Sequence, residues 1–377
     1  MKSPSRCRKE ADNSIGRNNR NNRNNRNNRN NRNNRNESMM TITYPARVEL
    51  AQTPTPLIHC ERMSEFLGVE LWVKRDDMTG IEFSGNKIRK LEFLLADARR
   101  RGADVVITGG GEQSNHCRAT ALAATRLGLE SRLLLRTEDP TAPPPTRGNI
   151  LLSRLAGSEI VWIDHATWAK RAQAFASEAA TLTRVGKTPY IIPEGGSNPM
   201  GSWGYIRCAD ELSRQLSSLG PEKATTVVYP CGSGGTGAGL IVGGKTLNWD
   251  QRQLAVVGVN VCNDAAYFVR EIGVIASGFH GVTCLESDLD AADIDIIGGY
   301  VGRGYAKSSP NELAVAIEFA KREAIIVDPV YTGKALFGLA SELKRDPKRF
   351  GQRVIFVHTG GIFGLFPQAE CFESVLR

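Results

Sequence analysis

The architecture follows from the stretch Thr226-Val-Val-Tyr-Pro-Cys-Gly-Ser-Gly-Gly-Thr-Gly-Ala-Gly239, in which a short apolar strand runs directly into a glycine-rich turn. Glycines allow backbone N–H groups to converge on one point, and the helix expected after the turn adds its positive N-terminal end. The hydroxyl groups of Ser233 and Thr236 provide further donors. The turn therefore predicts a phosphate-binding site made by Gly232, Ser233, Gly234, Gly235 and Thr236.

Two other motifs overlap this turn. Gly232, Gly234 and Gly237 satisfy the dinucleotide pattern GxGxxG, which also needs an acidic residue at the end of the next strand. That strand, Leu254–Asn260, ends in Asn, so an NAD-dependent oxidoreductase is disfavoured. The segment Gly239–Thr246 matches a Walker A pattern but lies within the expected helix, so we interpret it as a chance match. A turn used only for packing remains the alternative interpretation.

Outward from this turn, short apolar strands alternate with helices from about residue 41 onward. Strands are expected at Glu70–Arg75, Asp104–Thr108, Arg132–Arg136, Glu159–Ile163, Tyr190–Pro193, Leu254–Asn260, Ala324–Val327 and Arg353–His358. Helices are expected at Asn86–Arg101, Cys117–Leu127, Thr167–Arg184, Asn311–Arg322 and Gly333–Leu343. This alternation predicts a two-domain α/β fold with mainly parallel, twisted sheets and helices on both faces. Ligands in such folds bind at the carboxyl ends of the strands.

A lysine stands at the start of the helix expected over Asn86–Arg101, in the loop Ser84-Gly-Asn-Lys87. A cation is unfavourable near the positive end of a helix, and that end helps to lower the pKa of an amine. A lysine that forms an imine must be partly neutral, so the position suits such a role. The alternative interpretation of Lys87 is a solvated surface lysine.

A third loop, Gly109–His116, follows a strand and precedes a helix. Ser114 and Asn115 are either helix caps or, together with exposed backbone N–H groups, donors to a carboxylate. Tyr305 lies in a glycine-flanked loop and is either a further donor or a half-buried loop aromatic. Two more loops follow expected strands, at Asp328–Gly333 and Val357–Gly361.

A phosphate-binding turn, a lysine at a helix start and a carboxylate-type loop together suggest pyridoxal phosphate. Four motifs also resemble the ACC deaminase/D-cysteine desulfhydrase family, and they occur in that family's order over about residues 45–366: Lys74–Thr79 (KRDDMT), Ser84–Glu92 (SGNKIRKLE), Gly110–Thr120 and Asp328–Lys334 (DPVYTGK). The resemblance implies the tryptophan-synthase-β-like fold of pyridoxal phosphate enzymes. It divides the chain into a tail (1–40), a large cofactor-binding domain (41–90 plus 200–377) and a small domain (91–199).

The resemblance also implies roles for individual residues. Lys87 would bind the cofactor covalently and then act as the base at Cα. The other cofactor contacts would be Asn115 to the 3′-oxygen, Gly232 to Thr236 to the phosphate, and Thr332 to the pyridine nitrogen. The substrate carboxylate and reacting side would meet Gln113, Ser114, Asn115 and His116, with Tyr305 and Tyr331 flanking the substrate. The catalytic set would be Lys87, Ser114, Tyr305 and Tyr331.

Two positions separate the branches of the family. Enzymes similar to ACC deaminase have Glu after the tyrosine, where this chain has Thr332, and Gln in place of His116. A neutral threonine favours an unprotonated pyridine ring, which is adequate for β-elimination. The resemblance therefore implies a carbon–sulfur lyase that converts D-cysteine to pyruvate, ammonia and hydrogen sulfide. L-cysteate sulfo-lyase and ACC deaminase activity stay open, because Glu112 and the Ala306-Lys-Ser-Ser segment depart from the family pattern near the substrate pocket.

The net charge of +8 belongs to the N-terminal tail. Residues 1–38 contain 11 Lys and Arg against 3 acidic residues, and the remaining 339 residues contain 37 of each. Seven arginines recur at every third position from Arg17 to Arg35 with only Asn between them, which predicts a disordered segment. One interpretation is an arm that binds RNA or another polyanion. We favour the other, an expanded simple repeat upstream of a start at Met39 or Met40.

The remaining composition excludes several classes of protein. The eight cysteines contain no CxxC pair and the five histidines show no metal-ligand spacing, so neither a disulfide framework nor a metal site is expected. No apolar run approaches the roughly 20 residues of a membrane helix. We therefore expect a cytoplasmic enzyme that acts on a small amino acid, and the resemblance implies a homodimer.

Overall fold

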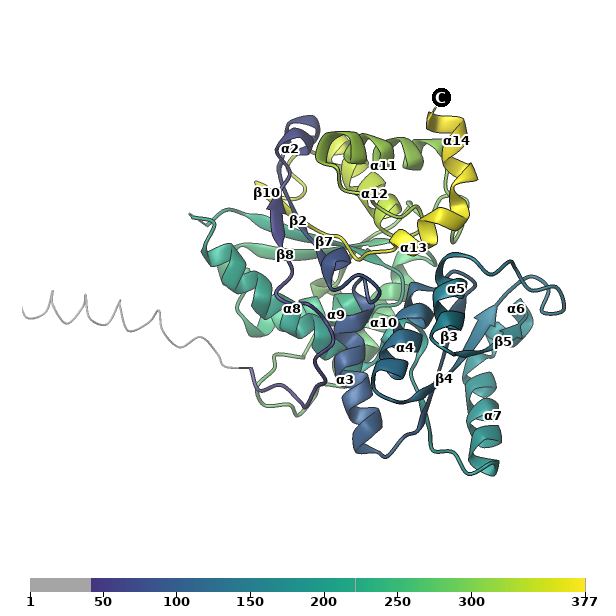
Figure 1. Cartoon of the computed structure of the whole chain (residues 1–377). Coiled ribbons are helices and arrows are strands. Elements are labelled where there is room, and N and C mark those ends of the chain that lie inside the picture. Colours follow the sequence, from purple (N-terminus) through teal and green to yellow (C-terminus); the bar gives the residue numbers. More distant parts are fainter. Residues whose placement is uncertain (1–41, 221, 377) are drawn as a thin grey trace, which may run out of the picture. The chain divides into compact units, whose positions relative to one another are not determined.

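The computed structural model describes residues 42–220 and 222–376, and Figure 1 shows the arrangement of their helices and strands. The predicted disorder of residues 1–40 and the arginine repeat therefore lie outside the described residues. Every helix within the described part of the chain is too short or too polar to cross a bilayer.

The larger of two sheets has six strands, in the order β1-β2-β10-β7-β8-β9. They are β1 (Leu57–His59), β2 (Glu70–Lys74), β7 (Thr225–Cys231), β8 (Leu254–Asn260), β9 (Asp295–Ile297) and β10 (Arg353–Val357). All neighbouring pairs are parallel except β1 and β2, which are antiparallel. The carboxyl ends of β7 and β10 therefore lie at the same edge of this sheet.

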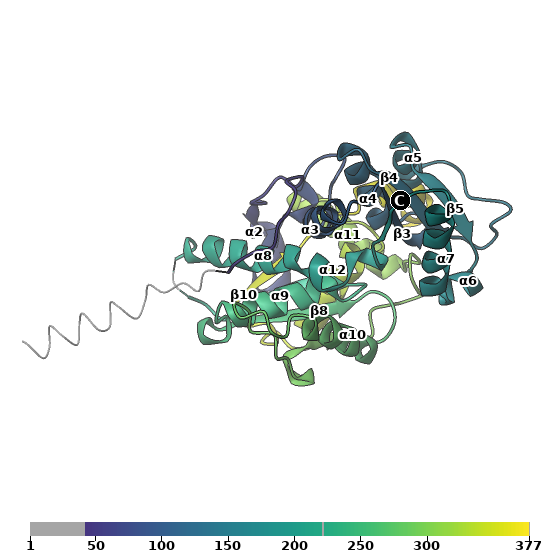
Figure 2. The same cartoon turned by 90° about the horizontal axis from the view of Figure 1, so that it is seen from below.

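Helices cover both faces of the larger sheet (Figures 1 and 2). One face packs against α2 (Glu61–Leu67), α11 (Pro310–Glu323) and α12 (Thr332–Arg345), and the other against α8 (Pro199–Ser217), α9 (Gly235–Thr246) and α10 (Ala265–Ser277). Successive residues of each strand pack alternately into the cores on the two faces of the sheet. Val228 and Phe356 join the α11–α12 core, while Val227 and Val357 join the α8–α9 core. Both faces are buried, as expected for a parallel sheet.

The smaller sheet has four parallel strands in the order β5-β4-β3-β6. They are β3 (Val105–Gly111), β4 (Glu130–Arg136), β5 (Glu159–Ile163) and β6 (Pro189–Ile191). Its helices are α3 (Lys87–Arg100), α4 (Asn115–Arg126) and α5 (Gly148–Leu155) on one face, and α6 (His165–Ala169) and α7 (Arg171–Arg184) on the other. Short 3-10 turns follow β2 (η1, Asp76–Met78) and β6 (η2, Glu194–Gly196), and the chain ends in α13 (Ile362–Leu365) and α14 (Glu370–Leu376).

This architecture confirms the predicted α/β fold with mainly parallel sheets between helices. The expected strand Ala324–Val327 is wrong. Ala324 ends α11 in the left-handed conformation (φ +54°), and Ile325 and Val327 pack onto the face of the larger sheet without joining it. The helix expected over Thr167–Arg184 is interrupted at Lys170, where α6 ends and α7 begins. The division at residues 91 and 199 remains a proposal.

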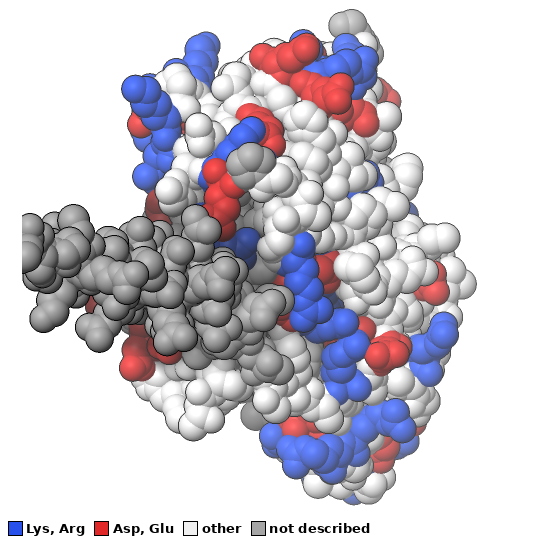
Figure 3. Space-filling view, turned by 90° about the vertical axis from the view of Figure 1, so that its left-hand side faces the viewer, with Lys and Arg blue, Asp and Glu red and all other residues white. Residues whose placement is uncertain are grey.

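The surface of the described residues carries both signs of charge. On the face shown in Figure 3, Lys and Arg side chains lie beside Asp and Glu, with broad uncharged areas between them. Basic side chains are more frequent at the lower end and at the upper left edge of this view. The picture agrees with the equal numbers of acidic and basic residues beyond residue 38.

Candidate active site

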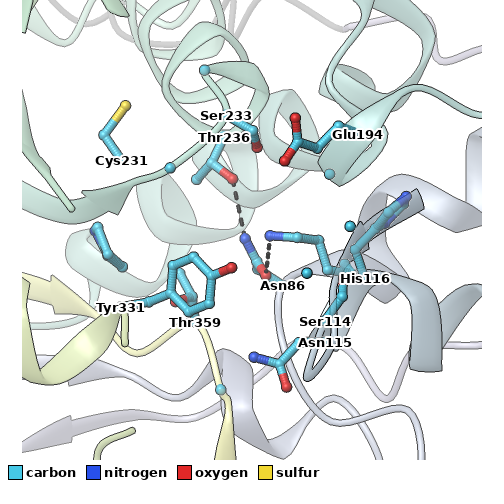
Figure 4. Close-up of a pocket in the computed structure, with 18 of the residues that line it drawn as sticks. Asn86, Ser114, Asn115, His116, Glu194, Cys231, Ser233, Thr236, Tyr331 and Thr359 are labelled. Carbon is cyan, nitrogen blue, oxygen red and sulfur yellow. Dashed lines mark hydrogen bonds between the residues drawn. The ribbon is translucent and has the colours of Figure 1, made fainter. Parts of the chain in front are cut away.

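A cavity lies where strands of both sheets end and three helices begin. It is lined by Lys87 at the start of α3, by Gly110 and Gly111 at the end of β3, and by the turn after β7. The predicted residues that line it are Lys87, Ser114, Asn115, His116, Gly232, Ser233, Gly234, Thr236, Tyr305 and Tyr331. Gln113, Gly235 and Thr332 are not among its lining residues. Figure 4 shows the cavity with Ser233 and Thr236 on one side and Ser114 and Asn115 on the other.

Lys87 is the first residue of α3 and is half-buried in the cavity wall. Its Nζ donates a hydrogen bond to Oδ1 of Asn86 at 3.0 Å. Burial lowers the pKa of Lys87 to about 8, although the carboxylates of Asp328 and Glu194 act in the opposite direction. An appreciable fraction of the amine is therefore neutral near pH 7, as attack on an aldehyde requires.

A buried ionic network fixes the start of α3. Arg89 donates from Nε and Nη2 to the two carboxylate oxygens of Asp76, at 2.9 and 2.7 Å, and from Nη1 to Glu211 at 2.9 Å. Burial alone would raise the pKa of Asp76, but the charge and hydrogen bonds of Arg89 outweigh it and lower this pKa. Because Glu211 belongs to α8, the network holds α3, and with it Lys87, against α8. Removing one partner would leave a buried charge uncompensated.

The turn between β7 and α9 is shaped as a cradle. Gly234 has φ +79°, a conformation that favours glycine and lets the chain turn into α9 at Gly235. Ser197 braces the turn, since its Oγ donates to Oγ of Ser233 at 2.9 Å and accepts from the N–H of Gly235 at 3.2 Å. A Cβ on Gly235 would lie 2.8 Å from Oγ of Ser197, so only glycine lets Ser197 pack this closely against the turn. A glycine-rich turn at a helix N-terminus suits a phosphate.

Lys90 lies one helical turn after Lys87 and is fully buried beside this cradle. Its Nζ donates to the carbonyl of Gly195 at 3.1 Å and to Oγ of Ser197 at 3.3 Å, and lies 3.0 Å from where a Cβ of Gly235 would be. Burial and the charge of Lys87 lower the pKa of Lys90 well below its usual value. No carboxylate of the described residues forms an ion pair with Lys90, so an anion in the cradle would supply the missing negative charge.

The first turn of α4 presents the residues that were predicted to meet a carboxylate. Ser114 caps the helix, and its Oγ accepts from the backbone N–H three residues on at 3.2 Å. Asn149 orders the neighbouring residues by donating to Oδ1 of Asn115 at 2.9 Å and to the carbonyl of Gln113 at 3.0 Å. The side chain of Gln113 accepts from the N–H of Asn149 at 2.8 Å and lines a second cavity. Ser114 and Asn115 thus remain beside Lys87, while Gln113 is turned away.

His116 is buried and anchored to the smaller sheet. The hydroxyl of Thr108 donates to the carbonyl of Ile192 at 2.8 Å, so Nε2 of His116 is the donor to Thr108 at 2.9 Å. Burial and the charges of Lys87 and Lys90 lower the pKa of His116 well below its usual value, so the ring is neutral. Its Nδ1 has no hydrogen-bond partner among the described residues. In Figure 4 the ring lies across the cavity from Tyr331.

Tyr305 and Tyr331 come from separate loops and meet at the cavity. Their hydroxyl oxygens are 2.5 Å apart, and their ring centroids are 5.8 Å apart at an angle of 72°. Burial raises the pKa of both phenols above the ordinary value. Both phenols therefore keep their protons near neutral pH, and one donates to the other.

Thr332 is fully buried at the start of α12 and does not line the cavity. Its Oγ1 donates to Oδ1 of Asp328 at 2.5 Å and accepts from the N–H of Asp328 at 2.8 Å. Thr359, which follows β10, lines the cavity instead and is labelled in Figure 4. The carbonyl of Thr359 accepts from the N–H of Asn86 at 3.1 Å, which ties the end of β10 to the start of α3. The structure thus brings Thr359, and not Thr332, to the cavity.

Glu194, in the turn η2, adds a carboxylate to the same cavity. Its Oε2 lies 3.4 Å from Nε of Arg171. Burial raises the pKa of Glu194, and the positive charges of Arg171, Arg136 and Lys87 oppose that rise. Glu194 and Lys87 therefore influence each other's protonation.

The residues of the site that the sequence did not indicate include Asn86, Lys90, Glu194 and Thr359. Lys90 could have been found, because it lies three residues after Lys87 and so on the same face of the helix. The loop containing Thr359 follows an expected strand, but nothing local assigns its hydroxyl a role. No sequence motif points to Glu194, because its position in the cavity depends on how η2 packs against the start of α3.

The donor set fits pyridoxal phosphate. A glycine-rich turn beside a buried amine that has no ion-pair partner among the described residues suits the phosphate, and an amine of lowered pKa in the same cavity suits the aldehyde. On an α/β fold with this edge-of-sheet cavity, these features define a pyridoxal-phosphate-dependent enzyme. A family model described as "Pyridoxal-phosphate dependent enzyme" matches residues 48–360, and the chain belongs to that family.

Several known proteins are similar over most of the chain. A bifunctional D-cysteine desulfhydrase/1-aminocyclopropane-1-carboxylate deaminase of Arabidopsis thaliana, named as mitochondrial, is 41% identical over 338 residues, covering 87% of this chain and 81% of that protein. A D-cysteine desulfhydrase of Klebsiella pneumoniae is 38% identical over 333 residues, covering 87% of this chain and 98% of that protein. A crystal structure of an ACC deaminase homologue has a TM-score of 0.77 at 34% identity and covers 88% of this chain and 96% of its own.

A more distant structure, a fungal L-serine ammonia-lyase from Rhizomucor miehei, has a TM-score of 0.59 at 18% identity and covers 85% of this chain and 98% of its own. It shares the fold. Together with the family match, these findings confirm the predicted resemblance, the fold class and the pyridoxal phosphate cofactor.

Proposed function

We propose that this chain is a lyase that removes the sulfur substituent of D-cysteine by β-elimination. The observation that carries the proposal is Lys87, whose amine of lowered pKa lines one cavity with the start of α4 and the Tyr305–Tyr331 pair. That cavity combines a base, a carboxylate-binding helix start and two phenols. The names of the relatives from Arabidopsis thaliana and Klebsiella pneumoniae support D-cysteine as the substrate.

Pyridoxal phosphate, when bound, supplies an electron sink for the pair left at Cα. The proposed holding residues are Lys87 for the aldehyde carbon, and Lys90 with the turn Gly232–Thr236 for the phosphate. Asn115 remains the predicted partner of the 3′-oxygen. Because Thr359 lines the cavity and the hydroxyl of Thr332 is bonded to Asp328, we propose Thr359 as the partner of the ring nitrogen.

Different residues of the chain then bind the substrate, remove its Cα proton and stabilise the leaving group. Ser114 and the first N–H groups of α4 bind the carboxylate, and Nζ of Lys87 takes the Cα proton. The Cβ–S bond breaks, its electron pair leaves with sulfur, and the Tyr305–Tyr331 pair donates a hydrogen bond to the departing sulfur. Sulfur is released as hydrogen sulfide, and the remaining enamine takes up water to give pyruvate and ammonia.

The test is a comparison of three substrates with the full chain loaded with pyridoxal phosphate. D-cysteine is expected to give pyruvate and sulfide in equal amounts, and Lys87→Ala is expected to lose both products. Sulfite from L-cysteate at a higher kcat/KM would assign the chain to the sulfo-lyases. Production of 2-oxobutyrate from 1-aminocyclopropane-1-carboxylate at a higher kcat/KM would assign it to the deaminases. Either result would contradict D-cysteine as the main substrate.

We also propose a cytoplasmic homodimer with the domain division given above. All seven cysteines of the described residues are free thiols, which supports a reducing compartment. Light scattering on the purified chain tests the dimer, and a mass of one chain would contradict it. Binding of RNA through the arginine repeat is the alternative from another class, and it predicts salt-dependent binding that disappears without residues 1–38.

A further inference from the structure

Arg118 is a fully buried arginine behind the active site, and it has no ion-pair partner among the described residues. It lies on α4 three residues after Asn115, so both side chains leave the same face of the helix. Its guanidinium lies over the ring of Phe363 in α13, with Cζ 5.0 Å from the ring centroid. A buried charge is costly unless hydrogen bonds or an anionic ligand compensate it.

The acceptors that the described residues offer to this guanidinium are neutral oxygens. Nε donates to Oδ1 of Asn149 in α5 at 2.9 Å. Nη2 donates to the carbonyl of Ser84 at 2.7 Å, and Nη1 donates to the carbonyl of Glu82. Ser84 and Glu82 belong to the loop that leads into Lys87. Arg118 therefore joins this loop to α4 and α5, and its positive charge is not neutralised by a carboxylate.

The contact with Arg118 fixes the orientation of the Asn149 amide, which is itself buried. An arginine has donors only, so the atom of Asn149 that faces Nε is the oxygen. The amide nitrogen then faces the carbonyl of Gln113 at 3.0 Å, and a carbonyl can only accept. Both ends of the Asn149 side chain therefore require the same orientation.

The orientation of Asn115 follows from that of Asn149. Because the nitrogen of Asn149 donates to Asn115 at 2.9 Å, the atom that receives this bond is Oδ1. A Cβ placed on Gly364 would lie 3.5 Å from Nδ2 of Asn149 and 3.9 Å from Oδ1 of Asn115, so this bond lies on the side of α13. In Figure 4 the oxygen of Asn115 points away from Tyr331. Nδ2 of Asn115 has no acceptor among the described residues, and Asn115 lines the cavity, so an N–H donor is available there.

We propose that Arg118 acts through Asn149 and Asn115 as a relay that presents an N–H donor to the 3′-oxygen of pyridoxal phosphate and favours the anionic form of that oxygen. The contact of Asn115 with the 3′-oxygen is the one that the resemblance implies, and the relay gives it a cause. Hydrogen bonds in a chain polarise one another, and a bond to an ionised oxygen is stronger than one to a neutral oxygen. An anionic oxygen at the end of the relay would also offset the charge of Arg118.

The relay has a consequence for the chemistry of the cofactor. The 3′-oxygen is attached to the pyridine ring next to the carbon that carries the aldehyde. A donor that keeps negative charge on this oxygen changes the electron distribution of the ring that serves as the electron sink. Arg118 itself contacts neither cofactor nor substrate, so it is a positioning residue. The proposal rests on the cofactor and is independent of the substrate.

Two substitutions interrupt the relay at different points. Asn149→Asp replaces the amide nitrogen with an oxygen of similar size, so Arg118 gains an ion pair while Asn115 loses its donor. The amide of Asn115 is then expected to turn its nitrogen toward the new carboxylate and its oxygen toward the cavity. Arg118→Gln removes the charge and leaves Asn149 in place. Arg126→Gln is the matched control, because Arg126 is exposed at the far end of the same helix.

Binding of two compounds without an aldehyde tests the relay without turnover. Pyridoxine 5′-phosphate has the 3′-oxygen and 3-deoxypyridoxine 5′-phosphate lacks it, and neither can attach to a lysine. In calorimetric titrations of the full chain freed of cofactor, we expect the unaltered chain and Arg126→Gln to bind the first compound at least about tenfold more tightly.

The relay variants are expected to lose this preference. Asn149→Asp should abolish or reverse the ratio of the two affinities, and Arg118→Gln should lower it below about threefold. In both variants the Kd for the deoxy compound should change less than about threefold, which a merely structural defect would not allow. Absorption of bound pyridoxine 5′-phosphate gives a second readout, since an ionised phenol absorbs at longer wavelength than a neutral one. We expect the longer-wavelength form in the unaltered chain and the shorter-wavelength form in both variants.

Three results would overturn the proposal: equal affinities for the two compounds in the unaltered chain, a tenfold ratio that persists in either variant, or equal losses for both compounds. Asn149→Asp keeps the charge of Arg118 paired, so it decides the matter even where Arg118→Gln does not fold. No substrate enters the titrations, so absence of turnover with D-cysteine would contradict the proposed function and leave the relay untouched.

Discussion

At the scale of single residues, the protonation of Lys87 is set by opposing effects. Burial at the start of α3 lowers its pKa, and the carboxylates of Asp328 and Glu194 restore part of the loss. Lys90 is buried one turn away, and burial together with the charge of Lys87 lowers its pKa. A phosphate beside Lys90 would favour its charged form. The roles proposed for the two amines therefore differ, Lys87 at the aldehyde and Lys90 at the phosphate.

The lowered pKa of Lys87 predicts how capture of the cofactor depends on pH. Only the neutral amine attacks an aldehyde, so the initial rate of attachment rises about tenfold per pH unit below the pKa and levels above it. We expect the plateau to begin near pH 8, because burial lowers the pKa of Lys87 to about 8. The rate is measured from growth of the absorption band at about 410–430 nm that is typical of the attached cofactor.

Glu194→Gln provides the control for this pH profile. Its carboxylate raises the pKa of Lys87, so removing the charge is expected to move the midpoint to lower pH. A rate that keeps rising to about pH 10, as for an ordinary lysine, would contradict the proposed environment of Lys87.

At the scale of elements, the site depends on the starts of three helices and on the position of the loop that carries Tyr305. α3, α4 and α9 all begin at the cavity, where they bring Lys87, Asn115 and the glycine cradle together. The loop that carries Tyr305 is held by Lys334 of α12, whose Nζ donates to the carbonyls of Val301, of Gly304 at 2.8 Å and of Lys307 at 3.2 Å. Tyr331 immediately precedes α12. By binding the loop of Tyr305 from this helix, Lys334 therefore holds Tyr305 in position beside Tyr331.

Replacement of Gly235 tests the cradle. In Gly235→Ala the new methyl group would lie 2.8 Å from Oγ of Ser197 and 3.0 Å from Nζ of Lys90, so it would push both side chains away from the turn assigned to the phosphate. We expect the Kd for pyridoxal phosphate to rise by at least about tenfold, in line with the cost of overpacking. Gly273→Ala in α10 is the control, since nothing lies within 4 Å of its added Cβ. Equal affinities in the two variants would rule out this site for the phosphate.

Removal of the Lys334 ammonium tests the loop. Lys334→Met is expected to retain the cofactor band but to lower kcat for D-cysteine by about tenfold or more, since three carbonyls lose a charged donor. Trypsin cleavage at the exposed Arg303 and Lys307 is expected to accelerate at the same time. Lys344→Met, on the exposed side of α12, should change neither quantity. Unchanged proteolysis and kcat in Lys334→Met would show that Lys334 does not position Tyr305.

At the scale of the whole molecule, the excess positive charge and the proposed catalytic residues lie in different parts of the chain. The excess of +8 lies in residues 1–38, while the catalytic residues proposed here all belong to the part that the structure describes. A chain beginning at Met40 is therefore expected to keep its affinity for pyridoxal phosphate and its kcat/KM for D-cysteine within about twofold. Activity assays of the two chains side by side check this, and a loss of tenfold or more would assign the tail a part in catalysis.

The parts of this account that could be predicted from sequence are local. The cradle and Lys87 are readable because a strand, a glycine turn and a helix start follow one another along the chain. The roles of Thr332 and Thr359 could not be separated in this way, because they depend on contacts between distant segments. The hydroxyl of Thr332 is bonded to Asp328, and Thr359, at the end of β10, is bonded through its carbonyl to the start of α3. The expected strand Ala324–Val327 failed for a similar reason, since its apolar residues pack over the sheet and not within it.

The most direct test of the account is the identity of the lysine that carries the cofactor. Reduction of the loaded full chain with borohydride fixes the cofactor to its lysine, and peptide mapping by mass spectrometry then locates it. We expect a pyridoxyl group on Lys87, with Lys90 and every other lysine unmodified. A pyridoxyl group on Lys90 or on any other lysine, or none at all, would contradict it.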